Sequence, residues 1–178
     1  MSISDYKLIT TAEELRTEVE SLSVQPVVGF DTETTDLDPY RGRLRLMQLS
    51  APDGVRVIDL YRFGGADPKQ SDELEPLRRL LAAPRPVKIA HNAKFDAKWT
   101  KHTLGVELGG LFDTLLASQL VSAGDQDERH GLEAVASRFL NETIDKAERL
   151  SDWSGELSAA QLDYAARDAS VLLPLRER

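Results

Sequence analysis

The chain has 178 residues, the size of one globular domain, and we expect residues 1–178 to form a single domain. Hydrophobic residues make up 41% of it and charged residues 29%, a composition that excludes a disordered or fibrous protein. The sequence contains no cysteine, which excludes disulfides, thiolate metal sites and cysteine nucleophiles. Any metal ion must therefore be bound by oxygen or histidine ligands.

The net charge is −8, from 22 basic and 30 acidic residues. This balance argues against a protein that binds nucleic acid through bulk electrostatic attraction. A cluster of carboxylates that holds divalent cations is the exception, because the cations restore a positive potential where a phosphate approaches.

The first ten residues, MSISDYKLIT, lack the basic flank and apolar run of a signal peptide. The sequence also contains no apolar run of the roughly 18 residues that a membrane-spanning helix needs. We therefore expect a cytoplasmic protein that does not act at a membrane.

Short apolar or alternating runs separated by turn residues predict strands in the first half of the chain. Three of them, predicted to form an antiparallel meander, are Val27–Phe30, Leu44–Leu49 and Val55–Leu60. A fourth strand is predicted at Val87–Ala90.

Apolar residues spaced at about 3.6 residues predict helices in the remainder. These helices are Asp72–Leu81, Asn92–His102, Thr114–Val121, Leu132–Leu140 and Ala159–Leu175. Between the third and the fourth, Ser122–Arg129 is predicted to be a mobile loop. The order of elements predicts the α/β class: a mixed sheet, with the antiparallel meander joined to parallel strands, flanked by helices.

Asp31 and Glu33 end the first predicted strand in the sequence Phe-Asp-Thr-Glu-Thr. A strand has a side-chain period of two, so both carboxylates lie on one face and can share a cation. The alternative is a solvated pair at a strand end. A calcium-binding loop is excluded, because the sixth position from Asp31 is Asp36 rather than glycine, and the twelfth is Gly42 rather than glutamate.

Two further pairs of polar residues have a spacing of four. Asn92 and Asp96 are predicted on the helix after the fourth strand, projecting from one face about 6 Å apart. Tyr164 and Asp168 repeat the spacing on the last helix. The alternatives are a capping asparagine, surface acidic residues and a surface tyrosine.

In this order along the chain, Asp-x-Glu, Asn-x-x-x-Asp and Tyr-x-x-x-Asp resemble the exonuclease domains that use four metal-binding carboxylates and a tyrosine. This family includes ribonuclease D and the proofreading domain of DNA polymerase I. The resemblance covers nearly the whole chain and extends to Met-Gln-Leu-Ser at 47–50, Phe-Asp-Thr at 112–114, Arg-His-Gly-Leu at 129–132 and Asp-Trp-Ser at 152–154. It implies a ribonuclease H-like fold and the removal of nucleotides one at a time from the 3' ends of single-stranded DNA or RNA, as nucleoside 5'-monophosphates.

The resemblance also implies roles for the five residues of these motifs. Asp31 would bridge two divalent cations, Glu33 and Asp168 would hold the ion that activates water, and Asp96 would help to hold the second ion. Tyr164 would orient the attacking water, because a phenol with a pKa near 10 is a poor base at neutral pH. Ligands that are all oxygen favour Mg²⁺ or Mn²⁺ over zinc.

Substrate contacts are implied at Thr32, Leu37, Asn92 and His130. Leu37 matches the position of an apolar wedge against the terminal base, with a core leucine as the alternative. For His130 the alternative is a cap or packing residue. Five basic side chains either bind phosphates of the substrate or are simply solvated: Arg41, Arg43, Arg45, Lys94 and Lys98.

Several questions stay open at the level of the sequence. A non-catalytic module of the same fold and the proofreading part of a larger polymerase are alternatives to a self-standing exonuclease. A single-domain enzyme for short oligoribonucleotides is similar in length. Preference for DNA or RNA depends on contacts to one 2'-hydroxyl, which a sequence does not reveal.

Overall fold

The computed structural model describes residues 6–63, 68–123, 128–144, 147–148 and 150–178. Its sheet has six strands in the order β1-β4-β3-β2-β5-β6. Their bounds are Tyr6–Ile9 (β1), Val27–Thr34 (β2), Leu44–Ala51 (β3), Gly54–Asp59 (β4), Val87–Ala90 (β5) and Leu111–Asp113 (β6). The strands β2, β3 and β4 form the antiparallel meander, while β1, β5 and β6 pair in parallel with their neighbours. The predicted mixed sheet is therefore confirmed.

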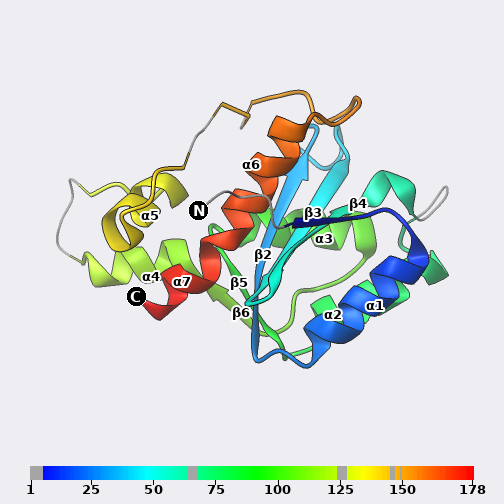
Figure 1. Cartoon of the computed structure of the whole chain (residues 1–178), viewed down its shortest axis with the longest axis horizontal. Helices are drawn as coiled ribbons and strands as arrows, with labels where there is room; N and C mark the ends of the chain where they lie inside the picture. The colour runs from blue at the N-terminus through cyan, green and yellow to red at the C-terminus, as the bar shows by residue number, and fades with distance from the viewer. Residues whose placement is uncertain (1–5, 64–67, 124–127, 145–146, 149) are drawn as a thin grey trace.

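Helices cover both faces of the sheet, with α6 and α7 in front and α3 behind in the view of Figure 1. The helices are Ala12–Ser23 (α1), Glu75–Ala82 (α2), Lys94–Leu104 (α3), Thr114–Val121 (α4), Leu132–Leu140 (α5), Ala159–Ser170 (α6) and Leu172–Glu177 (α7). Short 3-10 turns occupy Leu60–Arg62 and Asp72–Leu74. No helix within the described ranges is long and apolar enough to cross a membrane.

Side-chain alternation along β2 divides the core into two layers. Phe30 packs in the larger cluster, together with Trp99 of α3 and residues of α1 and α2. The opposite face of the sheet carries Leu46 and Val57 against the small residues of α6. The face that bears α6 is therefore the one toward which Asp31 and Glu33 point.

The first 26 residues contain elements that the sequence analysis did not predict. Thr11 caps α1: its hydroxyl oxygen accepts from Glu14 N at 3.3 Å, and Glu14 reaches back to Thr10 N at 3.2 Å. Leu15, Val19 and Leu22 form the buried stripe. These are the signals of a capped amphipathic helix. The strand β1 was also missed, although it has the same length as the predicted β5. The three-residue β6 is too short for alternation to reveal it.

The helix predicted at Ala159–Leu175 is two helices, which meet at Val171. Pro174 has no backbone N–H to donate to the carbonyl of Ser170, and its ring crowds that carbonyl. The prediction of one continuous helix is therefore wrong. Of the predicted loop at Ser122–Arg129, residues 124–127 lie outside the described residues.

Candidate active site

Three carboxylates converge where β2 passes under α6. One oxygen each of Asp31, Glu33 and Asp168 lies within 4.8 Å of the other two. The first two come from alternate positions of β2, as the strand period requires, and the third comes from the last turn of α6. Segments more than 130 residues apart in sequence thus form one cluster.

Close packing of α6 on β2 brings Asp168 to this position. The Ser50 hydroxyl of β3 donates to the carbonyl of Ala169 at 2.7 Å. A Cβ atom at Gly29 would lie 2.8 Å from the same carbonyl, so only glycine allows this approach. Ala165 and Ala166 are fully buried against the sheet. Small residues on both elements therefore set the distance between Asp168 and the strand carboxylates.

Asp96 approaches the cluster from the other side, on the first turn of α3. It is 2% exposed, and the Thr32 hydroxyl donates to its Oδ1 at 2.6 Å. Burial raises the pKa of Asp96 to about 7, against which the Thr32 hydrogen bond acts. Thr32, a predicted substrate contact, lies in the wall of the site with its hydroxyl on Asp96.

Asn92 does not lie on α3. It has a left-handed backbone with φ of 62°, and the helix begins at Lys94. The Asp113 carboxylate holds this junction, accepting from the backbone N–H of Asn92 at 3.0 Å and of Ala93 at 2.9 Å. The prediction that Asn92 and Asp96 project from one helical face is therefore wrong, although Asn92 still lines the cleft.

Tyr164 lies one helical turn before Asp168 and is partly buried, with its ring 6.3 Å from that of Trp153. Burial, followed by the negative charge of Asp168 and Glu33, raises the pKa of the Tyr164 phenol above its ordinary value. The phenol is therefore protonated at neutral pH, and its hydrogen bond to Asp168 contributes to that shift.

The carboxylates repel one another in a buried setting. Burial is the main cause that raises the pKa of Asp31 well above its ordinary value, and the charges of Asp96, Glu33 and Asp168 add to it. The pKa of Glu33 is also raised, first by burial and then by the charges of Asp168 and Asp96. Divalent cations would offset both the burial and the repulsion, and a donor set made only of carboxylate oxygens fits Mg²⁺ or Mn²⁺.

These residues line a cleft of about 830 Å³. Leu37 lies in its wall with 78% of its surface exposed, so the alternative of a core leucine is excluded. His130 is not among the lining residues, although Arg129 and Gly131 are. The Nδ1 atom of His130 lies 2.9 Å from the Ser118 hydroxyl of α4.

Arg45 is buried rather than solvated. It forms an ion pair with Asp59 at 2.8 Å and donates to the carbonyls of Trp153 at 3.3 Å and Gly155 at 2.8 Å. Arg45 therefore anchors the segment before α6 and is not available to a phosphate. The other four predicted cations are exposed: Arg41, Arg43, Lys94 and Lys98.

His91 was not singled out in the sequence, yet it lines the cleft at the end of β5. Its Nδ1 lies 2.9 Å from the Thr114 hydroxyl, and burial lowers the pKa of its imidazole, so the ring is neutral at pH 7. The sequence did offer one signal for a functional role of His91, because this residue directly precedes Asn92 at the end of a predicted strand.

A family model described as 3'-5' exonuclease matches residues 6–178, which is nearly the whole chain. The chain belongs to the 3'-5' exonuclease family. Among curated relatives, a ribonuclease D of Gluconacetobacter diazotrophicus is 38% identical over 169 residues, and a DNA polymerase I of Aquifex aeolicus is 36% identical over 172 residues. These matches cover 94% and 96% of this chain but only 40% and 26% of the relatives, so the chain spans less than half their length.

Solved structures share the fold of this chain. NrnC of Brucella melitensis, determined with bound Mg²⁺, aligns with a TM-score of 0.75 at 32% identity, covering 97% of this chain and 76% of the other. The same protein determined with pGG aligns with a TM-score of 0.76. The ribonuclease H-like fold that the sequence motifs implied is thus confirmed.

Proposed function

We propose that this member of the exonuclease family hydrolyses the terminal phosphodiester bond at the 3' end of a single strand and releases nucleoside 5'-monophosphates. The observation that carries the proposal is the cluster of Asp31, Glu33 and Asp168, with ligand oxygens within 4.8 Å of one another. Asp96 lies beside the cluster and affects its charge, since its own charge raises the pKa of Asp31 and of Glu33.

Four carboxylates would hold two divalent cations, Mg²⁺ or Mn²⁺: Asp31, Glu33, Asp96 and Asp168. Two such ions would activate the attacking water and neutralise charge on the phosphoryl group. The similar protein NrnC of Brucella melitensis was determined with bound Mg²⁺, which supports this choice of metal. Asp31, which lies in the cluster with Glu33 and Asp168, would share the binding of the cations with them.

Tyr164 would position the attacking water. A protonated phenol both donates and accepts a hydrogen bond. Because burial and neighbouring carboxylates raise its pKa, Tyr164 keeps its proton at neutral pH and orients the water rather than deprotonating it. Its contact with Asp168 places the hydroxyl beside the proposed metal ligands.

The strand end would enter the cleft between Leu37 and Asn92, both of which line it. An exposed leucine side chain can pack against the terminal base, and the Asn92 amide can reach the terminal sugar or phosphate. Thr32 and His130 stay predicted substrate contacts; the Thr32 hydroxyl already donates to Asp96.

Incubation of linear and circular single strands with the protein and Mg²⁺, Mn²⁺ or EDTA tests the proposal. We expect mononucleotides from linear strands with either metal, none with EDTA, and no cutting of circles. A strand with a 3'-phosphate or a stably paired end should be degraded more slowly. Internal cuts in circular strands would contradict an exonuclease.

The similarity to a DNA polymerase I favours a second candidate, the proofreading part of a larger polymerase. Rates on matched DNA and RNA strands, and on DNA primers with paired or mismatched 3' ends, distinguish the two. A strong preference for mismatched DNA ends supports proofreading, and faster removal from RNA supports a ribonuclease. Folded protein that binds strands but releases no nucleotide would instead indicate a non-catalytic module.

A further inference from the structure

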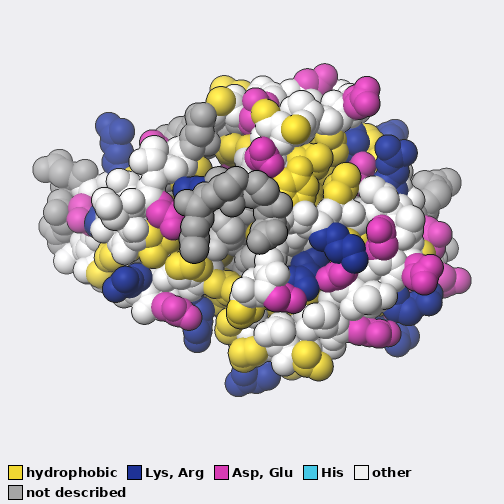
Figure 2. Space-filling model, in the orientation of Figure 1, with side chains coloured by type: hydrophobic (Ala, Val, Ile, Leu, Met, Phe, Trp, Pro, Cys, Tyr) yellow, Lys and Arg dark blue, Asp and Glu magenta, His cyan; other side chains and the backbone are white. Residues whose placement is uncertain are grey.

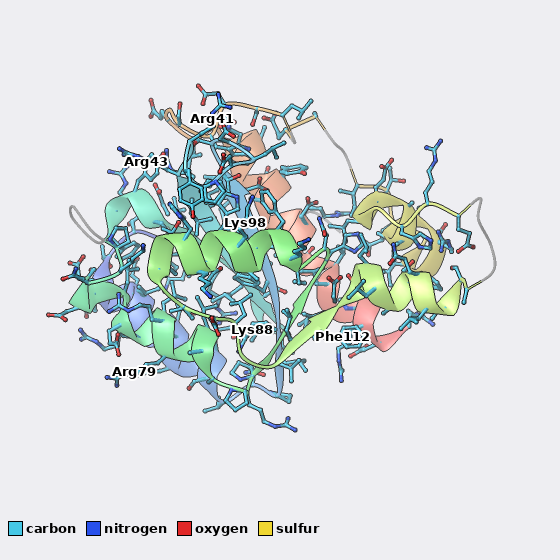
Figure 3. All side chains as sticks on the ribbon, turned by 180° about the vertical axis from the view of Figure 1, so that it is seen from behind. Arg41, Arg43, Arg79, Lys88, Lys98 and Phe112 are labelled. Carbon is cyan, nitrogen blue, oxygen red and sulfur yellow. The ribbon has the colours of Figure 1, made fainter. Side chains whose placement is uncertain are left out.

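The loop between β2 and β3, residues 35–43, begins at the cleft and extends away from it. Leu37 lines the cleft, whereas Tyr40, Arg41 and Arg43 are exposed. Figure 3 shows Arg41 and Arg43 at the top of the view, Lys98 of α3 below them, and Arg79 at the bottom. The loop thus carries two exposed cations, and its first residues line the cleft.

Hydrogen bonds give this loop a defined shape. The carbonyl of Asp38 accepts from the backbone N–H of Arg41 and of Gly42, both at 3.0 Å. The Asp38 carboxylate accepts from Tyr40 N at 3.1 Å, and the Asp36 carboxylate accepts from Asp38 N at 2.9 Å. The two acidic side chains of the loop are therefore engaged with its own backbone.

Two side chains of helix α3 contact the loop. The Lys98 ammonium donates to the carbonyl of Leu37 at 3.0 Å. The Tyr40 ring packs edge-on against His102 of α3, with the ring centroids 4.9 Å apart. Since Tyr40 remains 87% exposed, this packing fixes the ring while leaving most of it to solvent.

Tyr40 is an exposed aromatic residue that is followed in the loop by two exposed arginines, Arg41 and Arg43, on a chain with a net charge of −8. Figure 2 shows basic and acidic side chains distributed over the face that it draws. Within the described ranges, neither Arg41 nor Arg43 takes part in a salt bridge. Aromatic side chains and neighbouring cations are the two elements that bind single strands without regard to sequence.

We propose that Tyr40, Arg41 and Arg43 form a binding track for the nucleotides upstream of the terminal one. A base stacks on the Tyr40 ring, and the arginines bind phosphates of the same strand. The inference rests on the proposed function, because it takes the strand end to lie in the cleft beside Leu37. If the track exists, affinity depends on the length of the strand. A dinucleotide held at the carboxylates has too few nucleotides to reach Tyr40 and the arginines.

The test compares a dinucleotide with a strand of about ten nucleotides, a length within the range that single-strand-binding folds cover. RNA and DNA versions of both are used. For Tyr40→Ala we expect the KM for the longer strand to rise at least about fivefold, the lower limit for losing one stacked base. The KM for the dinucleotide should rise far less, and Tyr40→Phe should restore the longer strand. An equal rise for both substrates would overturn the track.

Salt dependence tests the two arginines separately. Binding of a fluorescent ten-nucleotide strand is measured by anisotropy in EDTA, where no hydrolysis occurs. If Arg41 and Arg43 each neutralise one phosphate, the double variant R41A/R43A lowers the slope of log affinity against log salt by about 1.4. Arg79→Ala is the matched control, since Arg79 is an exposed arginine on α2 that lies at the bottom of the view in Figure 3, away from Arg41 and Arg43.

The outcomes separate this inference from the proposed function. An unchanged salt slope in R41A/R43A, with wild-type protein that degrades both substrates, overturns the track and leaves the exonuclease standing. If R41A/R43A lowers the salt slope by about 1.4 but the wild-type protein releases no nucleotide, the track is supported and the exonuclease is contradicted.

Discussion

Removal of the Tyr164 hydroxyl tests the chemistry of the site with the smallest possible change to the side chain. Tyr164→Phe keeps the ring against Trp153 and removes the group that would orient the attacking water. We expect the single-turnover rate to fall roughly 10²- to 10⁴-fold, with Mn²⁺ affinity nearly unchanged in calorimetric titration. Equal losses of rate and metal affinity would instead show that Tyr164 supports the fold of the site.

Leu37 provides a second test at a single side chain. Its 78% exposure means that Leu37→Ala should leave the melting temperature unchanged, because surface substitutions alter stability by at most about 0.5 kcal/mol. If the side chain wedges against the terminal base, the KM for a single strand should rise several-fold to about tenfold. An unchanged KM would remove Leu37 from the substrate site.

The contact between α6 and β2 is the structural element on which the cluster depends. In Gly29→Ala the added Cβ meets first the Ser50 hydroxyl and then the carbonyl of Ala169, the latter at 2.8 Å. The bond between these two groups is disturbed, and α6 must shift and carry Asp168 with it. We expect a loss of about 1 to 3 kcal/mol in the free energy of unfolding and weaker Mn²⁺ binding. Gly155→Ala is the control, because a Cβ there meets nothing within 4 Å. Equal melting temperatures and equal metal affinities for the two variants would contradict this dependence.

The sequence predicted the elements that carry strong periodicity or sharp turns, including β2, α5 and the meander. It also singled out the carboxylates, because the order of the three motifs along the chain resembles that of the exonuclease family. The spacing of four was less reliable, since Asn92 precedes α3 and does not lie on it. It could not reveal that Arg45 pairs with Asp59, or that Asp113 holds the junction at Asn92, since these contacts join distant segments. The β1–α1 unit was missed although the Thr11 capping signal was present.

The stability of the whole molecule should depend on pH through its buried carboxylates. Their pKa values are raised in the folded state, to about 7 for Asp96, so the folded protein holds more protons than the unfolded chain between about pH 4 and 7. Without metal, the free energy of unfolding therefore falls as pH rises through this window. Mg²⁺ should raise the melting temperature more at pH 8 than at pH 5, which thermal unfolding with and without EDTA measures. A metal-free melting temperature that rises over this window would contradict the account.

The proposal that the carboxylate cluster holds catalytic metal ions is tested most directly by digestion of a 5'-labelled single strand with Mg²⁺, comparing wild type with Asp31→Asn. This variant removes one charge without changing the shape of the side chain. We expect the wild type to shorten the strand one nucleotide at a time from its 3' end. The folded variant should release no nucleotide, and its metal-free melting temperature should be equal or higher because repulsion is relieved. Retention of most of the activity by folded Asp31→Asn would contradict the account.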